Sequence, residues 1–345
     1  MNLSLSESKK KALYGLITQR YDVHMSRFPY AKYPSEPLNE WRKQFADAPH
    51  VRPDMIRSAL NWRCGFWQRS NAPFLQKKIA ITAIKSWPEF TGQAITDHAE
   101  ILAFWTDKFS NDTLGFDAAA FLLHLLYPTD LEMADRHRLS AMRDLLAEVG
   151  HEVPPEASAS DLTSLTIYTE FFRSLLPKMQ AQHGEQSAVK LDQFLMAYGN
   201  REALTKLSEK FGPSVEPIVS FVDWNDLTTE RFLPSAILGR SNADILFACL
   251  LLALELYPEK ATELKVESVV ELLPLGSGGV CNPASYHYAM IAMFGGQKGR
   301  DFFVFEDEAL SKSFTEQANH STRDMRFYKK HGNAKITVHS KYVKG

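Results

Sequence analysis

The segment FLLHLLYPTDLEMADRHRLSAM, residues 121–142, decides how this chain is interpreted. It continues a run, 118–126, that is apolar on every side except for one histidine, His124. A helix that is apolar all round is a buried helix. After a short loop, Asp135 is followed at once by Arg136, His137 and Arg138. The segment therefore predicts a buried helix that leads to one acidic residue among basic ones.

Asp135 stands at the start of the next predicted helix, 135–150, and Gly150 stands at its end. Both residue types commonly cap helices. A capping Asp accepts hydrogen bonds from backbone N–H groups of the first turn, and the helix dipole favours its negative charge. Both effects lower its pKa, so we expect Asp135 to be ionised. The same local pattern is also that of an ordinary helix cap, and His124 is expected to be a core histidine satisfied by one hydrogen bond.

The fold class predicted for the chain is mainly α, with a helical core and a smaller mixed α/β segment after it. The first 220 residues are expected to form helices near 7–24, 37–47, 53–70, 74–86, 97–109, 116–126 and 135–150, with two or three more over 160–210. Between the fifth and sixth of these, SNDTLGFD is expected to be a tight hairpin turn with Gly115 in a left-handed conformation.

The order of helix, hairpin with a central glycine, buried helix and capping Asp resembles the helix-hairpin-helix DNA glycosylase superfamily. In that superfamily the hairpin N–H groups hold the DNA backbone, and the catalytic Asp lies in a motif like Val-Asp-x-His. MADRHRLSAM (133–142) matches that motif, whereas TLGFDAAAFL (113–122) has one glycine in place of Gly-x-Gly. With SALNWRCGFW (58–67) and AVKLDQFLMAYG (188–199), the chain looks like a bacterial subgroup with the fold of 8-oxoguanine glycosylases.

This resemblance implies that Asp135 is catalytic and that His137 occupies the position of the motif's histidine. Bifunctional members carry a Lys in the hairpin, 19 residues before the Asp, as Schiff-base nucleophile. The nearest matching position is Asp117, 18 residues before Asp135, and there is no Lys between Lys108 and Lys178. The resemblance therefore implies a monofunctional glycosylase, with His137 and Asp117 in supporting roles.

The resemblance also implies a DNA-binding surface and a pocket for a flipped base. The expected contacts to the DNA backbone come from Gly115, Lys108, Arg136, Arg138 and Arg143. The expected pocket residues are Asn61, Trp62, Trp67, Gln68, Gln193 and Tyr198. Flat rings can stack on a base and amides can bond its edges, although Trp62 also fits a core position. We expect neither a metal nor another cofactor.

The distribution of charge is uneven along a chain of nearly balanced net charge, −2. Residues 1–100 hold 15 Lys and Arg against 9 Asp and Glu, and residues 323–345 hold seven basic residues and one acid. Such asymmetry is compatible with a surface that faces a polyanion, but ordinary solvated charge explains it equally well. The partner that the resemblance implies is double-stranded DNA. The three cysteines form no C-x-x-C pair, which argues against an iron–sulfur cluster or a zinc site.

Three parts of the chain are expected: an N-terminal helix and loop (1–50), a glycosylase-like domain (51–220), and a mixed α/β segment (221–345). The last part contains an apolar helix, 243–257, a helix over 283–294, and the strand-like runs DFFVFED and AKITVHSKYV. Its glycine-rich turn LGSGGVC lacks the ending of a phosphate-binding loop. The apolar run 245–254 is about half of what a bilayer requires. A cytoplasmic protein without a membrane segment is therefore expected, of undetermined oligomeric state.

The function expected from these features is removal of a modified base from DNA. One anti-phage glycosylase of this general kind excises a glucosylated cytosine derivative, so the substrate is either a glucosylated hydroxymethylcytosine of phage DNA or a damaged base in repair. The alternative is a DNA-binding or interaction module that keeps the fold without the chemistry. A third interpretation is an unrelated small-molecule enzyme that uses the segment GSGGVCNPASYHY with Cys281 as nucleophile, but no motif arranges a His and an acid around that cysteine.

Overall fold

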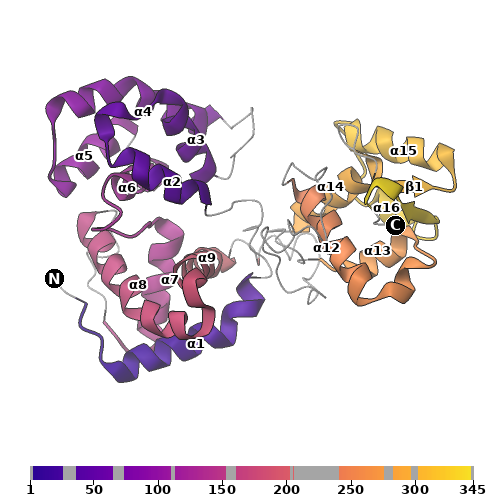
Figure 1. Ribbon diagram of the computed structural model, residues 1–345, viewed down its shortest axis with the longest axis horizontal. Coiled ribbons are helices and arrows are strands. Elements are labelled where there is room, and N and C mark those ends of the chain that lie inside the picture. Colours follow the sequence, from indigo (N-terminus) through magenta and orange to yellow (C-terminus); the bar gives the residue numbers. More distant parts are fainter. Residues whose placement is uncertain are drawn as a thin grey trace. The chain divides into compact units, whose positions relative to one another are not determined.

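The computed structural model describes residues 3–25, 36–64, 74–109, 113–152, 161–202, 205, 241–275, 283–296 and 302–342. These residues are mainly helical and divide into two compact units (Figure 1). The first unit comprises Met1–Arg20 and Ser35–Asn200, and the second comprises Tyr21–Pro34 and Arg201–Gly345. The sequence placed a boundary near residue 220, which lies outside the described residues.

One group of helices in the first unit surrounds a fully buried helix. Its members are α2 (Glu36–Phe45), the 3-10 turn η2 (Ala48–His50), α3 (Pro53–Arg63), α4 (Phe74–Gln93), α5 (His98–Phe109) and α6 (Thr113–Leu126). The helices α2, α3 and α5 all pack on α6, whose residues 115–125 are all buried. The apolar run of the sequence is therefore a buried helix, as predicted.

The second group of helices in this unit carries the segment around Asp135. It consists of α7 (Arg136–Glu148), α8 (Leu162–His183), η4 (Gly184–Gln186) and α9 (Ser187–Gly199), which pack on one another. The helix α1 (Glu7–Met25) is joined to this group by hydrogen bonds from Lys9 to the carbonyl of Gly150 and from Tyr14 to Gln182. Figure 1 shows these helices and the α2–α6 group as two neighbouring layers.

Three helix boundaries in the first unit differ from the prediction. Helix α6 begins at Thr113, so Gly115 lies in its first turn and the expected left-handed turn is wrong at this residue; residues 110–112 lie outside the described part. Helix α4 continues past Pro88 to Gln93, because Trp87 and Phe90 pack in the aromatic core around Trp105. The helix α3 ends at Arg63 and is capped by Cys64, so it stops before the predicted end at residue 70; residues 65–73 lie outside the described part.

The described residues of the second unit form a small helical body with one pair of strands. It contains α12 (Asn242–Leu256), η5 (Pro258–Ala261), α13 (Val266–Leu272), α14 (Pro283–Gly295), β1 (Phe303–Phe305), α15 (Glu308–Asn319), α16 (Phe327–Lys330), β2 (Ile336–Val338) and η6 (Ser340–Tyr342). The strands pair antiparallel, with Phe303 opposite Val338. Both strand-like runs of the sequence thus contain strands, and α12 and α14 lie within one residue of their predicted bounds. Among the described helices, none is long and apolar enough to cross a membrane.

Candidate functional site

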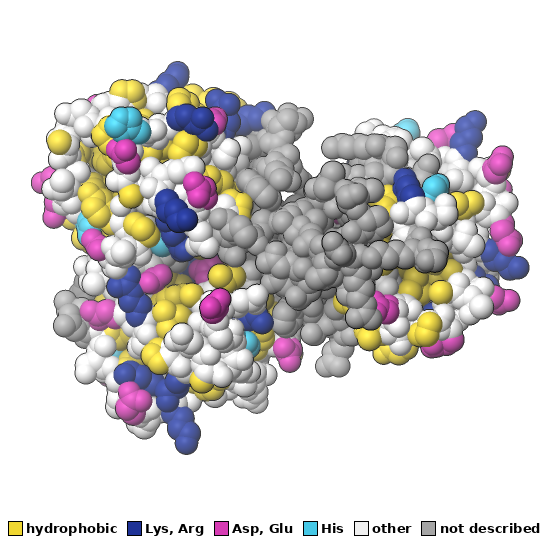
Figure 2. Space-filling view, viewed as in Figure 1, with side chains coloured by type: hydrophobic (Ala, Val, Ile, Leu, Met, Phe, Trp, Pro, Cys, Tyr) yellow, Lys and Arg dark blue, Asp and Glu magenta, His cyan; other side chains and the backbone are white. Residues whose placement is uncertain are grey.

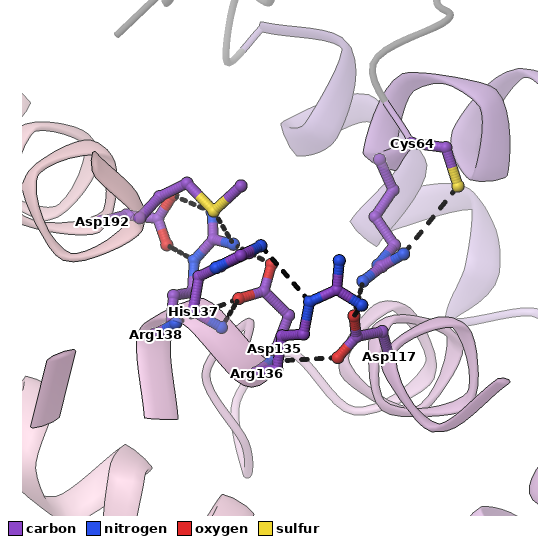
Figure 3. A network of polar contacts seen from close by, with 9 residues as sticks. Cys64, Asp117, Asp135, Arg136, His137, Arg138 and Asp192 are labelled. Carbon is purple, nitrogen blue, oxygen red and sulfur yellow. Dashed lines mark hydrogen bonds and ion pairs between the residues drawn. The ribbon is translucent and has the colours of Figure 1, made fainter. Parts of the chain in front are cut away.

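Asp135 caps the N-terminus of α7, as the sequence predicted (Figure 3). Its Oδ1 accepts hydrogen bonds from the backbone N–H groups of His137 and Arg138, both at 3.0 Å. At the other end of the helix, Gly150 follows the cap with a φ of 62°, which glycine adopts without strain. Asp135 is 5% exposed, so its carboxylate is held almost entirely inside the protein.

Arg138 joins Asp135 to Asp192 of helix α9. Its Nη1 donates to Asp135 Oδ2 at 2.6 Å, and its Nε and Nη2 donate to the two oxygens of Asp192 at 2.6 and 2.8 Å. Arg138 is 7% exposed. Because the guanidinium is buried between two carboxylates, it does not face solvent, and this contradicts the contact to the DNA backbone that we predicted for it. Its place is that of a residue that holds Asp135.

We call Asp135, Arg138 and Asp192 the carboxylate clamp. With both carboxyl groups ionised, the clamp holds two negative charges and one positive charge, so it keeps one net negative charge. A charge-assisted hydrogen bond of this length is among the stronger interactions in a protein. A buried ion pair stabilises a fold only when hydrogen bonds satisfy its polar atoms, and the clamp satisfies both oxygens of Asp135.

Asp117 connects the buried helix α6 to the start of α7. One of its oxygens accepts a hydrogen bond from the backbone N–H of Arg136 at 2.9 Å, and the other lies 3.0 Å from the Arg63 guanidinium. The Arg136 side chain lies 3.6 Å from the same carboxylate and is half-exposed. The structure therefore places Asp117 beside Asp135, as a supporting role requires, and α6 fixes the backbone that follows Asp135.

The two neighbouring carboxyl groups have pKa values shifted in opposite directions. Burial raises the pKa of Asp135, but the charges of Arg138 and Arg63 and the backbone hydrogen bonds outweigh it, so the pKa falls to about 2. Burial raises the pKa of Asp117 above its usual value despite Arg63, and the charge of Asp135 adds to this rise. Burial also lowers the pKa of His137, so its imidazole is neutral at neutral pH. Asp135 is therefore the permanently ionised member of the pair.

Asp192, Arg63 and Tyr168 belong to this site although the sequence did not single them out. Tyr168 of α8 is fully buried, and its hydroxyl has no hydrogen-bond partner within the described part of the chain. Burial raises its pKa, and the nearby charge of Asp192 raises it further.

The residue that could have pointed to Asp192 in the sequence is Gly199, at the end of the same helix. A Cβ at Gly199 would lie 1.8 Å from the backbone oxygen of His137. Only glycine therefore lets α9 approach α7 this closely.

His124 is a core histidine, as predicted, with one more hydrogen bond than expected. Its Nδ1 donates to the carbonyl of Leu131 at 2.7 Å, and its Nε2 accepts from Arg42 Nε at 3.0 Å. Burial, with the positive charge of Arg42, lowers its pKa to about 3. The imidazole is therefore neutral, and it fixes the loop that leads from α6 to Asp135.

Most of the predicted pocket residues do not gather around Asp135. Trp62 packs against Trp41 and Phe121, with ring centres 5.8 and 6.0 Å away, which is the core position that the sequence left open. The Tyr198 hydroxyl donates to Glu148 at 2.9 Å, at the opposite end of α7 from Asp135. Asn61 and Gln193 are half-buried on α3 and α9, while Trp67 and Gln68 lie outside the described residues.

The remaining residues predicted to contact DNA differ in their exposure to solvent and in their ion pairs. Lys108 forms an ion pair with Glu89 at 2.8 Å, and Gly115 is buried in α6. Neither residue is therefore placed to contact a phosphate in this structure. Arg136 is half-exposed beside Asp117, and Arg143 lies half-buried two turns along the same helix. Arg136 is therefore the predicted contact that lies both at the surface and at the site.

Comparison with known protein families, with curated proteins and with solved structures gave no match. The resemblance inferred from the sequence thus stays a prediction, carried by the motif around Asp135. Within the ranges that the structure describes, no three His, Cys, Asp or Glu side chains group as they would around a metal ion.

Proposed function

We propose that this protein is a monofunctional DNA glycosylase of the cytoplasm, in which Asp135 promotes hydrolysis of the N-glycosidic bond of a modified base. The observation that supports this proposal most directly is the state of Asp135: an ionised carboxylate, buried, and fixed by two backbone N–H groups at the start of a helix. Glycosidic cleavage creates positive charge on the sugar, and a fixed carboxylate in a dry site stabilises such charge.

The reaction requires no group beyond the protein and water. The bond between C1′ and the base nitrogen breaks with its electron pair going to the base, while a water oxygen bonds to C1′. The base takes up one proton, which the attacking water releases. With a pKa of about 2, Asp135 is a weak base, so it orients the water and stabilises the sugar cation rather than storing the proton.

The charge of the carboxylate clamp allows Asp135 to stabilise a sugar cation although Arg138 lies beside it. A guanidinium beside the catalytic carboxylate would by itself cancel the charge that the sugar cation needs. Asp192 neutralises that guanidinium through two hydrogen bonds, so the net charge of the clamp stays negative. Arg136 is the cation of this site that reaches the surface: among the described residues, its half-exposed side chain contacts Asp117 at 3.6 Å and His137 at 3.4 Å.

Two substrate classes follow from the proposal, a glucosylated hydroxymethylcytosine of phage DNA and a damaged base in repair. The competing function is a DNA-binding or interaction module without chemistry. One observation favours that alternative: both oxygens of Asp135 are occupied in the described structure, as they would be in a purely structural cap. The measurement must therefore distinguish a structural helix cap from a catalytic carboxylate at Asp135.

The test compares wild type with Asp135→Asn on duplexes carrying 8-oxoguanine, uracil, alkylated adenine, or hydroxymethylcytosine with and without glucose. Alkali then converts abasic sites to strand breaks. Asp307→Asn is the matched control, since Asp307 caps α15 through two backbone N–H groups and has no arginine partner in the described chain. We expect breaks after alkali with wild type and the control, and a loss of about 100-fold or more with Asp135→Asn. Base release by all three proteins would exclude catalysis by Asp135, and release by none would favour the binding module.

A further inference from the structure

Helix α4 presents a cationic and apolar face to solvent. Its buried side consists of Ile79, Ala80, Ala83, Trp87 and Phe90. With about 3.6 residues a turn, positions 74, 78, 81 and 85 lie along one line on the opposite side. These positions hold Phe74, Lys78, Ile81 and Lys85, all exposed, and we call them the α4 stripe.

Among the residues that the structure describes, the cations on this face have no acidic partners. Lys77, Lys78 and Lys85 form no ion pair among the described residues, and neither does Arg57 on the exposed side of the adjoining helix α3. The one acid of α4, Glu89, is bound to Lys108. Figure 2 shows Lys and Arg side chains over the edge of the first unit where α3 and α4 lie. The face is therefore complementary to an anionic partner.

The apolar members of the stripe indicate which anion fits. Phe74 is 78% exposed and Ile81 49% exposed, so each projects between lysines rather than into the core. Alternation of cations with an aromatic and an aliphatic side chain suits a nucleic-acid strand, whose phosphates pair with Lys while its sugars and bases contact apolar groups. The helix α3, which packs on α4, also carries cations. Arg57 is exposed on it, and Arg63, about 9 Å further along the helix axis, pairs with Asp117 at the Asp135 site.

We propose that the α4 stripe binds the DNA strand that flanks the target nucleotide, with Lys78 and Lys85 on successive phosphates and Phe74 against a sugar or an unstacked base. This inference rests on the proposed function, because it takes the strand at the Asp135 site to continue onto α3 and α4. It assigns the main electrostatic contact to helix α4 rather than to Arg138, which is buried.

The test measures binding of an unmodified, fluorescently labelled duplex as a function of salt. The double variant Lys78→Ala/Lys85→Ala is compared with Lys11→Ala/Lys43→Ala, which removes the same charge from exposed lysines of α1 and α2 that have no ion pair in the described chain. We expect the stripe variant to lower the slope of log Kd against log salt by about 2 and the control to leave it unchanged. Phe74→Ala should weaken binding by about tenfold. Thermal melting checks that each variant is folded.

The outcomes separate this inference from the proposed glycosylase activity. Reduced salt dependence in the stripe variant, whether or not any base is released, supports the α4 stripe. Equal slopes in the two double variants overturn it, even where wild type releases a base. Absence of DNA binding by wild type also overturns it. Loss of binding to phosphatidylserine vesicles, with DNA binding intact, would assign the stripe to a membrane surface instead.

Discussion

Arg138 binds Asp192 through two hydrogen bonds, at 2.6 and 2.8 Å, although the two residues lie 54 positions apart in the sequence. The same guanidinium binds Asp135 at 2.6 Å. A buried arginine needs compensation from more than one side, and here one carboxylate caps α7 while the other belongs to α9. The contact therefore joins two helices and sets the charge beside Asp135 at the same time.

The first prediction concerns Asp192→Asn, which keeps the shape of the side chain and removes its charge. The buried guanidinium then keeps one ionised partner, and we expect the free energy of unfolding to fall by about 2 kcal/mol. The measurement is urea unfolding at neutral pH. If the glycosylase activity is present, the rate constant of base release should fall as well, because the charge of the clamp becomes zero.

Glu132→Gln is the matched control for Asp192→Asn. Glu132 binds Arg173 at 2.8 Å, but that arginine side chain is 40% exposed, so water screens the pair. We expect a loss below about 1 kcal/mol. Equal losses in the two variants would show that burial of Arg138 contributes nothing to the strength of its ion pair.

The second prediction concerns Gly199→Ala, at the point where α9 meets α7. A Cβ there would lie 1.8 Å from the backbone oxygen of His137, and a backbone atom cannot move away as a flexible side chain can. We expect a destabilisation of about 2–3 kcal/mol in thermal or urea unfolding. Gly15→Ala in α1 serves as control, because nothing lies within 4 Å of its Cβ position, and alanine there should stabilise the helix by about 0.5–1 kcal/mol. A neutral Gly199→Ala would mean that the two helices are less closely packed than described.

Much of this fold was predictable because its signals are local. Asp135 as a cap, Gly150 after the last turn and the buried run before them are each determined by neighbours a few positions away. The strands around Phe303 and Ile336 were found for the same reason, from short apolar runs. Such signals survive in the fold because backbone hydrogen bonding within a helix involves near residues, and because the alternation within a strand is a property of the strand's own residues.

The site was predictable only in part, because its partners are distant in sequence. Asp192 looks like any acid on a helix until Gly199 brings that helix against α7, and Arg63 reaches Asp117 from another helix altogether. Gly115 was misleading for the opposite reason: glycine is common in turns, but here it sits in the first turn of a helix whose burial decides its conformation. Tertiary packing outweighed local preference at each of these positions.

The third prediction concerns Tyr168→Phe, which removes a buried hydroxyl that has no hydrogen-bond partner in the described residues. Removing it leaves no other group unpaired, so we expect the free energy of unfolding to change by less than about 0.5 kcal/mol. Tyr198→Phe is the matched control, since its hydroxyl is bonded to Arg20 at 2.7 Å and to Glu148 at 2.9 Å, and it should cost about 1–2 kcal/mol. A loss at Tyr168 as large as at Tyr198 would indicate a bound water that links the hydroxyl to the carboxylate clamp.

The fourth prediction concerns pH and His124, whose pKa falls from its usual value of 6.5 to about 3 in the folded protein. Between these values the unfolded chain binds a proton that the folded one does not, so stability rises with pH and is lost as pH falls from about 6.5. From pH 7 to pH 5 this one group should lower the free energy of unfolding by about 2 kcal/mol. Replacement by glutamine, His124→Gln, removes the titration and should flatten the pH dependence by that amount, although the variant is less stable at pH 7. Urea unfolding of both proteins at pH 5, 6 and 7 measures the difference in slope, and identical slopes would mean that burial and the charge of Arg42 do not hold the imidazole in its neutral form.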